Sequence, residues 1–179
     1  MKALFLDRDG VINYDYGYVH EKERFEFIDG IFQLVREARS RSYKIIVITN
    51  QSGIGRGYYS ERDFILVTRW MKSVFLHHSA PIDKVYFSPY HPTKGIGKYK
   101  KDHETRKPKI GLITRAKIRL NLSLDKSVLI GDNLTDIQAG ISSGVAKNIL
   151  FSSNKIVHKQ HHNFTVINCL YEANKYLID

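Results

Sequence analysis

Residues 4–10 read LFLDRDG, an apolar strand that runs directly into Asp7 and Asp9. Side chains alternate between the two faces of a strand, so both aspartates are expected to point the same way if strand geometry continues. Two carboxylates on one side repel each other unless a cation lies between them or one stays protonated. Gly10 lets the backbone turn sharply after them. The stretch therefore predicts a nucleophile, a proton-transfer group and a hard-metal site side by side.

Strand-like and helix-like segments alternate along the rest of the chain. Strands are expected at Ala3–Leu6, Ile45–Thr49, Lys84–Phe87, Val128–Ile130, Asn148–Phe151 and, as a short strand, Thr165–Ile167. Helices are expected at Gly30–Ser42, after an N-cap at Ser60, from Pro108 to about Leu120, at Thr135–Ser143 and from about Leu170 to Leu177. This order predicts an α/β fold, with a Rossmann-like, mainly parallel sheet covered by helices on both faces.

The composition is that of one ordinary globular domain. Of the 179 residues, 42% are hydrophobic and 26% charged, so a single domain over residues 1–179 is expected. The two long connections, Val11–Asp29 and Ser88–Lys107, are expected to cover the site in place of a large cap domain.

Charge and cysteine content limit the cellular compartment and the kind of ligand that the sequence favours. The formal net charge is +10, which favours an anionic ligand, either a phosphorylated metabolite or nucleic acid. No zinc finger, RNA-recognition signature or basic heptad pattern accompanies the charge. The one cysteine, Cys169, excludes an intramolecular disulfide, and the sequence holds no apolar run of membrane-spanning length and no signal-peptide pattern. A cytoplasmic protein without a membrane partner is expected.

Ligands of parallel sheets bind outside the carboxyl ends of the strands, where this sequence places polar residues. Asp7 can attack phosphorus, while Asp9 can protonate the leaving oxygen and then deprotonate water. The Thr49 hydroxyl can hold phosphoryl oxygens, and Lys107 can offset the negative charge. Asp132, which follows VLIG, supplies a carboxylate for Mg²⁺. Asp136, one helical turn later, either supports this site or only interacts with the helix dipole.

These residues occur in four motifs that resemble those of the haloacid dehalogenase superfamily of phosphotransferases. The motifs are DRDG at 7–10, TN at 49–50, KP at 107–108 and GDNLTD at 131–136. Longer stretches resemble the D-glycero-D-manno-heptose-1,7-bisphosphate 7-phosphatases and their histidinol-phosphate phosphatase relatives. These are DRDGVIN at 7–13, D-x-G-Y-V at 15–19, TNQSGIGRGYY at 49–59 and RKPKIG at 106–111.

The resemblance implies a role for each of these positions. Asp7 would be the nucleophile and Asp9 the general acid/base. Mg²⁺ would be held by Asp7, the Asp9 carbonyl and Asp132. The transferring phosphoryl group would be bound by Thr49, Asn50 and Lys107. The substrate pocket would be lined by Gln51, Ser52 and Arg106, with Arg106 suited to a second phosphate and Arg56 a weaker candidate for the same role.

One stretch departs from the family it resembles. Those relatives commonly carry a structural zinc site of the form C-P-H-H-P followed by C-x-C-R-K-P. The four ligand positions here are Ser88, Tyr90, His103 and Thr105, and serine, tyrosine and threonine are not usual structural zinc ligands. No structural zinc is expected, so packing and hydrogen bonds hold this loop or it stays mobile until substrate binds.

The resemblance implies a Mg²⁺-dependent phosphatase that acts through an aspartyl-phosphate. Its expected substrate is a small phosphorylated sugar: it would remove the C7 phosphate of a heptose bisphosphate, for lipopolysaccharide or capsule biosynthesis. Histidinol phosphate and a nucleic-acid 3′-phosphate are alternative substrates. A basic nucleic-acid-binding module that retains the fold is the alternative of another class, and the intact catalytic set argues against it. A monomer is expected from the resemblance. His158, His161 and His162 have a spacing that can bind metal, although a solvated cluster is favoured over this reading.

Overall fold

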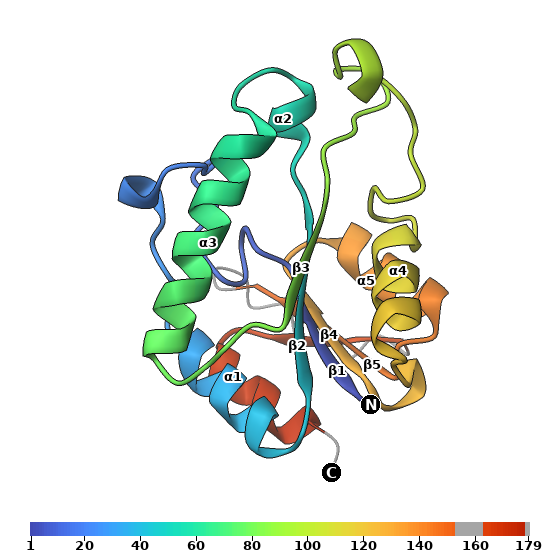
Figure 1. Ribbon diagram of the computed structural model, residues 1–179. Helices are drawn as coiled ribbons and strands as arrows, with labels where there is room; N and C mark the ends of the chain where they lie inside the picture. The colour runs from blue at the N-terminus through green and yellow to red at the C-terminus, as the bar shows by residue number, and fades with distance from the viewer. Residues whose placement is uncertain (153–162, 178–179) are drawn as a thin grey trace.

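Six parallel strands form one sheet at the centre of the molecule, in the order β3-β2-β1-β4-β5-β6 (Figure 1). The structure is a computed structural model, and it describes residues 1–152 and 163–177. The strands are β1 (Ala3–Leu6), β2 (Lys44–Asn50), β3 (Lys84–Ser88), β4 (Val128–Gly131), β5 (Lys147–Phe151) and β6 (Thr165–Ile167). The predicted α/β fold with a parallel, Rossmann-like sheet is confirmed. His158, His161 and His162 lie outside the described residues.

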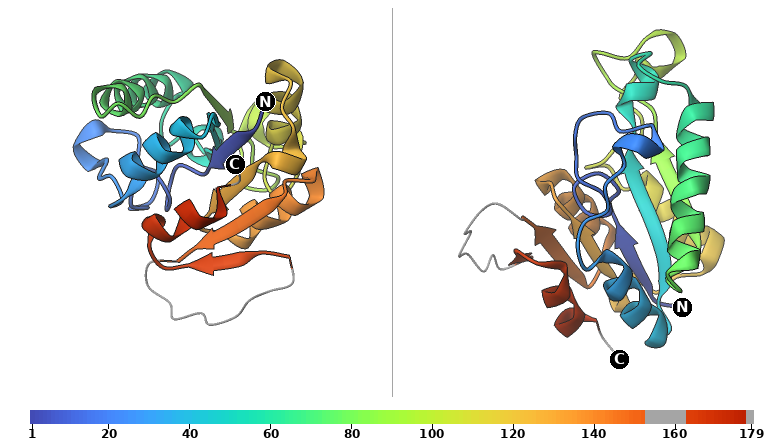
Figure 2. Two further views of the ribbon diagram at one scale, coloured as in Figure 1. Left: turned by 90° about the horizontal axis from the view of Figure 1, so that it is seen from below. Right: turned by 90° about the vertical axis from the view of Figure 1, so that its left-hand side faces the viewer.

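Helices cover both faces of the sheet, as Figure 2 shows. One layer contains α1 (Ile31–Ser40), α3 (Glu61–His77) and the C-terminal 3₁₀ helix η4 (Leu170–Tyr176), and the other contains α4 (Gly111–Leu120) and α5 (Leu134–Ser143). Strand alternation divides β1 between two cores: Leu4 and Leu6 pack toward α1 and α3, whereas Phe5 packs toward α4 and α5. The sheet is therefore buried on both faces, which explains its continuous apolar strands.

Capping residues set where two helices begin. Ser60 caps α3, as the sequence predicts, and also forms a capping box with Asp63. Asn133 caps α5 in the same way, and Asp136 is its box partner: the Asp136 carboxylate accepts the Asn133 N–H at 3.1 Å. This cap fixes the backbone of Asp136 directly beyond the end of β4.

One predicted helix start is wrong, one predicted helix is of another type, and one short helix was not predicted. Helix α4 begins at Gly111 rather than Pro108, because both ends of the Asn50 side-chain amide hold the main chain of Lys107 outside the helix. The C-terminal segment forms the 3₁₀ helix η4, and Leu170 and Ala173, three residues apart, bury the same side as a 3₁₀ repeat requires. The short helix α2 (Ser52–Gly55) was not expected.

Two long connections lie beyond the carboxyl ends of the strands. The connection from β1 to α1 contains the 3₁₀ helix η1 (Lys22–Arg24), and that from β3 to α4 contains η2 (Gly97–Tyr99) (Figure 1). Within the described ranges, these connections hold only short 3₁₀ helices, in agreement with the predicted lack of a large cap domain. No helix among residues 1–152 and 163–177 is both long and apolar enough to cross a membrane.

Candidate active site

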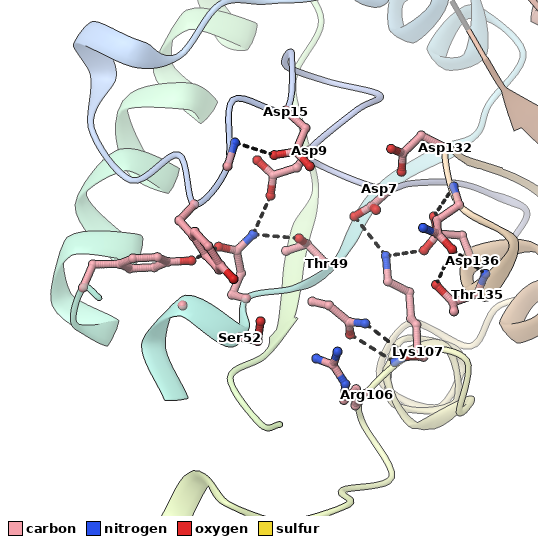
Figure 3. Close-up of a pocket in the computed structure, with 17 residues that line it drawn as sticks. Asp7, Asp9, Asp15, Thr49, Ser52, Arg106, Lys107, Asp132, Thr135 and Asp136 are labelled. Atoms are coloured by element: carbon pink, nitrogen blue, oxygen red, sulfur yellow. Dashed lines mark hydrogen bonds and ion pairs between the residues drawn. The ribbon is translucent and has the colours of Figure 1, made fainter. Parts of the chain in front are cut away.

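A cavity of about 500 Å³ opens at the carboxyl ends of β1, β2 and β4 (Figure 3). All nine residues predicted to form the site line it: Asp7, Asp9, Thr49, Asn50, Gln51, Ser52, Arg106, Lys107 and Asp132. The remaining lining residues are Asp15, Gly17, Tyr18, Gly53, Tyr59, Asn133, Thr135 and Asp136. The parallel sheet thus brings together side chains that lie up to 129 residues apart in the chain (7 to 136).

Lys107 is the charged centre of this cavity. Its ammonium Nζ lies 2.9 Å from Asp7 Oδ1 and 2.7 Å from Asp136 Oδ1, and it donates to the Ile48 carbonyl at 2.8 Å. Burial opposes its charge, but the carboxylates of Asp7 and Asp136 outweigh burial and raise the pKa of Lys107 above the usual lysine value. The lysine is therefore a fixed cation with all three of its hydrogens engaged.

Three carboxylates converge beside this one ammonium. Oxygens of Asp7, Asp132 and Asp136 all lie within 4.8 Å of one another. Burial raises the pKa of Asp7, and Lys107 only partly offsets this effect. Burial, together with the neighbouring Asp136, raises the pKa of Asp132 to about 7. The cluster carries more negative charge than Lys107 neutralises, and carboxylate oxygens are the ligands of hard divalent cations, so its donors fit Mg²⁺.

Gly10 allows the Asp132 carboxylate to reach this cluster. Its backbone has φ of +84°, and a Cβ built on it would lie 2.1 Å from Asp132 Oδ2. Only glycine combines this left-handed conformation with so close an approach. The turn predicted after the two aspartates therefore also leaves the space that the Asp132 side chain occupies.

Asp9 faces a different set of partners from Asp7 (Figure 3). Its Oδ1 accepts hydrogen bonds from Arg8 Nη2 at 2.7 Å and from Asn13 Nδ2 at 3.0 Å, and its Oδ2 accepts one from Gln51 Nε2 at 2.9 Å. Strand β1 ends at Leu6, so the alternation that would align the two carboxylates stops before Asp7. The two side chains share the cavity but have separate partners, which is the division expected of a nucleophile and a proton shuttle.

Arg8 does not line the cavity but holds Asp9 through a buried ion pair. The guanidinium is 1% exposed and lies near the rings of Phe25 and Phe64. It also donates to the Val19 carbonyl at 2.6 Å, so one side chain ties the β1–α1 connection to Asp9. A charge so deeply buried is held by its ion pair rather than by water.

The residues after β2 have unequal places in the site. Thr49 is 1% exposed, and its Oγ1 accepts a hydrogen bond from Gln51 Nε2 at 2.8 Å. Asn50 donates to the Lys107 carbonyl at 3.1 Å and accepts from the Lys107 N–H at 3.0 Å, so it positions the lysine. Contact of Asn50, Gln51 and Ser52 with a substrate stays a prediction.

Arg106 lines the cavity, and Arg56 lies close enough for its charge to act on Arg106. Arg106 donates to the Tyr90 carbonyl at 3.0 Å, and burial, followed by the nearby charge of Arg56, lowers its pKa. Arg56 lies with its guanidinium 5.6 Å from the centre of the Tyr18 ring, and its buried Nε has no hydrogen-bond partner among the described residues. Two neighbouring guanidinium groups that repel each other favour a bound anion.

The four residues that occupy the zinc-ligand positions of the family that this chain resembles also meet in space. Thr105 Oγ1 lies 3.0 Å from Ser88 Oγ and 2.8 Å from His103 Nδ1, which also accepts the Thr105 N–H. The Tyr90 ring stacks on His103, with 3.9 Å between ring centres. Of the two alternatives for this loop, the structure shows the one held by hydrogen bonds and packing. The absence of zinc stays a prediction, which metal analysis of the purified protein tests.

Replacement of Thr105 by valine is expected to lower the free energy of unfolding by about 1–3 kcal/mol, because the Ser88 hydroxyl and the His103 ring lose a partner in a buried place. Urea unfolding followed by circular dichroism measures the change. The same substitution at Thr93, an exposed residue of this connection, is the control. Equal stability of the two variants would show that the hydrogen bonds of Thr105 do not stabilise the fold.

Several residues of the site were missed by sequence reasoning. Arg8 and Asn13 flank Asp9 within DRDGVIN, and a charged residue between two strand-end acids is a signal that could have indicated an ion pair. Tyr59 reaches the cavity from the turn after α2 and Thr135 from the first turn of α5, and the sequence offers no periodic pattern that reveals either position.

Comparisons with known proteins agree with this geometry. A family profile described as "Polynucleotide kinase 3 phosphatase" matches residues 6–170. The D-glycero-alpha-D-manno-heptose-1,7-bisphosphate 7-phosphatase of Burkholderia mallei is 55% identical over 149 residues, which are 83% of this chain and 79% of that protein.

Two solved structures show the same fold. A putative haloacid dehalogenase-like phosphatase from Mesorhizobium loti superposes with a TM-score of 0.87 and 30% identity over 99% of this chain and 84% of that one. The D,D-heptose 1,7-bisphosphate phosphatase from B. bronchiseptica, complexed with magnesium and phosphate, gives a TM-score of 0.83 and 22% identity over 99% and 98%. The predicted relationship is confirmed. The chain belongs to the polynucleotide kinase 3 phosphatase family of haloacid dehalogenase-like phosphatases, among relatives named D-glycero-D-manno-heptose-1,7-bisphosphate 7-phosphatases.

Proposed function

We propose that this phosphatase removes the C7 phosphate of a heptose 1,7-bisphosphate through an aspartyl-phosphate formed on Asp7. The observation that carries the proposal is the single cavity in which Asp7, paired with Lys107 at 2.9 Å, lies among every other predicted site residue. The name of the B. mallei relative and the magnesium and phosphate bound to the B. bronchiseptica protein support the substrate and the metal.

The residues can divide the chemistry into two displacements. In the first, an Asp7 carboxylate oxygen forms a bond to phosphorus as the bond from phosphorus to the sugar oxygen breaks, and Asp9 gives its proton to that oxygen. In the second, Asp9 takes a proton from water, whose oxygen attacks phosphorus and releases Asp7. Free phosphate leaves, and both aspartates return to their starting states.

The remaining groups hold charge and position. Lys107 fixes the nucleophile, and its ammonium offsets the charge of the phosphoryl group. Mg²⁺, held by Asp7, Asp132 and the Asp9 carbonyl, would supply further positive charge at the phosphoryl oxygens. Asp136, for which the sequence left two roles open, forms an ion pair with Lys107 and so supports the site.

The arginine pair fits the second phosphate of such a substrate. Arg106 lines the cavity, the charge of Arg56 acts on it from nearby, and a bound anion would relieve their mutual repulsion (Figure 3 labels Arg106). A phosphate on both ends of the substrate therefore matches a cavity with positive charge at both ends.

Four further points stay predictions: that residues 1–179 act as one domain, that the protein is a monomer, that it is cytoplasmic, and that it serves lipopolysaccharide or capsule biosynthesis.

A substrate panel tests the assignment. Phosphate release is measured with Mg²⁺ on both anomers of the heptose 1,7-bisphosphate, on heptose 7-phosphate, histidinol phosphate and a 3′-phosphorylated oligonucleotide. The highest kcat/KM is expected for a heptose bisphosphate, because only it occupies both cationic ends. A higher kcat/KM for a non-sugar ester would overturn the assignment of a heptose bisphosphate as the substrate. Steeply salt-dependent nucleic-acid binding without phosphate release would instead support the binding-module alternative.

Within this panel, Arg106→Gln is expected to lower kcat/KM for the bisphosphate by about 10- to 100-fold, the value of one hydrogen bond between charged groups. The loss for heptose 7-phosphate is expected to be much smaller, since that substrate lacks the second phosphate. Lys100→Gln removes one charge from an exposed position of the same connection and is the matched control. Equal losses for both substrates would place Arg106 outside the second-phosphate site.

A further inference from the structure

A buried chain of hydrogen bonds links Tyr59, which lies just before α3, to two groups of the reaction. The Tyr59 hydroxyl donates to Gln51 Oε1 at 2.5 Å. Gln51 Nε2 donates to Asp9 Oδ2 at 2.9 Å and to Thr49 Oγ1 at 2.8 Å. One amide therefore contacts the proposed proton shuttle and the proposed phosphoryl-binding hydroxyl at once, and its orientation affects both.

The partners of Gln51 fix which end of its amide faces which group. In its carboxylate form, the form that takes a proton from water in the second displacement, Asp9 only accepts hydrogen bonds, so it requires the NH₂ end of the amide. The reversed amide would turn its oxygen toward the Asp9 carboxylate and would accept the only hydrogen of the Thr49 hydroxyl. In the observed orientation Gln51 donates to Thr49 Oγ1, and the Thr49 hydrogen stays available for a phosphoryl oxygen.

Tyr59 is held so that it favours this orientation. It is 7% exposed, and burial raises the pKa of its hydroxyl well above the usual tyrosine value, so the group remains a donor. Its ring stacks on His20, with 4.7 Å between ring centres and planes within 8°. The ring also packs against Gly53, where a Cβ would lie 2.2 Å from it. The hydroxyl has little freedom to leave Gln51.

We propose that Tyr59 is a positioning residue for phosphoryl transfer, which acts through Gln51 to keep the Thr49 hydroxyl a donor and the Asp9 carboxylate in place. Tyr59 touches neither the nucleophile nor the acidic cluster, so its effect belongs to the geometry of the reacting groups. The inference rests on the proposed function, since it assigns Thr49 and Asp9 their roles in that reaction.

Tyr59→Phe tests the inference, because it removes one oxygen atom and keeps the packed ring. We expect kcat to fall about 10-fold, the usual size of such indirect contacts, with KM and the melting temperature almost unchanged. Tyr58→Phe, the same change at a neighbour that is 57% exposed, is the control. Retention of the wild-type kcat in Tyr59→Phe would overturn the inference, and so would a fall caused by lost folding or by a raised KM.

A double-mutant cycle separates action through Gln51 from any other effect. In the Gln51→Ala background, Tyr59→Phe is expected to change kcat by less than twofold, because the connecting amide is gone. Additive losses in the double variant would contradict the proposed route.

A measurement without substrate distinguishes failure of this inference from failure of the proposed function. The side-chain amide of Gln51 is expected to give one sharp pair of NMR resonances in the wild type and shifted or doubled resonances in Tyr59→Phe. An unchanged pair would refute the positioning role even if every substrate of the panel fails. A changed pair beside an inactive wild type would leave the positioning intact and reject only the heptose reaction.

Discussion

Asp7→Asn is expected to reduce Mg²⁺-dependent phosphate release by about 10⁴-fold or more, the loss typical of a missing nucleophile. An amide oxygen is a poor nucleophile toward phosphorus, so no aspartyl-phosphate forms. Asn also removes one of the three carboxylates of the acidic cluster and the partner of Lys107 at 2.9 Å. Steady-state assays with the heptose bisphosphate and a generic aryl phosphate measure the loss.

Asp125→Asn is the matched control for this experiment, since Asp125 is an exposed residue far from the cavity. It is expected to retain full activity. Mass spectrometry of wild-type protein quenched in acid during turnover is expected to show one phosphoryl group, and Asp7→Asn protein is expected to show none. Turnover by Asp7→Asn within tenfold of the wild type would reject the covalent mechanism.

Lys107→Met is expected to lower the free energy of unfolding by about 3–5 kcal/mol, the usual cost of removing one partner from a buried ion pair. The change leaves Asp7, Asp132 and Asp136 to repel one another and leaves the buried Ile48 carbonyl without its donor. Phosphate release is expected to fall with it. Urea unfolding followed by circular dichroism gives the free energy.

Lys109→Met provides the comparison, because Lys109 pairs with Asp102 at 2.6 Å on the surface. Lys109→Met is expected to lower the free energy of unfolding by at most about 1 kcal/mol. Added Mg²⁺ is expected to recover part of the stability of Lys107→Met, since a bound cation replaces the lost positive charge. If the two lysine variants unfold alike, the buried network does not stabilise the fold.

The sequence predicted the sheet and the members of the site for one physical reason. Parallel strands place their carboxyl ends at one edge, so polar residues after β1, β2 and β4 must meet there. It could not predict how they pair. Asp7 and Asp9 separate because β1 ends at Leu6, and Asn50 binds the main chain of Lys107. The sequence did not predict a place for Tyr59 in the site, because its hydroxyl reaches Gln51 only through the turn after α2. Such pairings depend on loop paths, which no periodicity encodes.

The ammonium of Lys107 has a consequence for how this protein folds. Its three partners are Asp7 after β1, the Ile48 carbonyl in β2 and Asp136 in α5, and the contact with Ile48 alone closes 59 residues of chain. Contacts of such long range are expected to form late, after loop closure and after β4 has paired with β1. We therefore expect partly folded chains to lack the cavity. During refolding, recovery of phosphatase activity should coincide with the last cooperative step and not with the earlier gain of secondary structure.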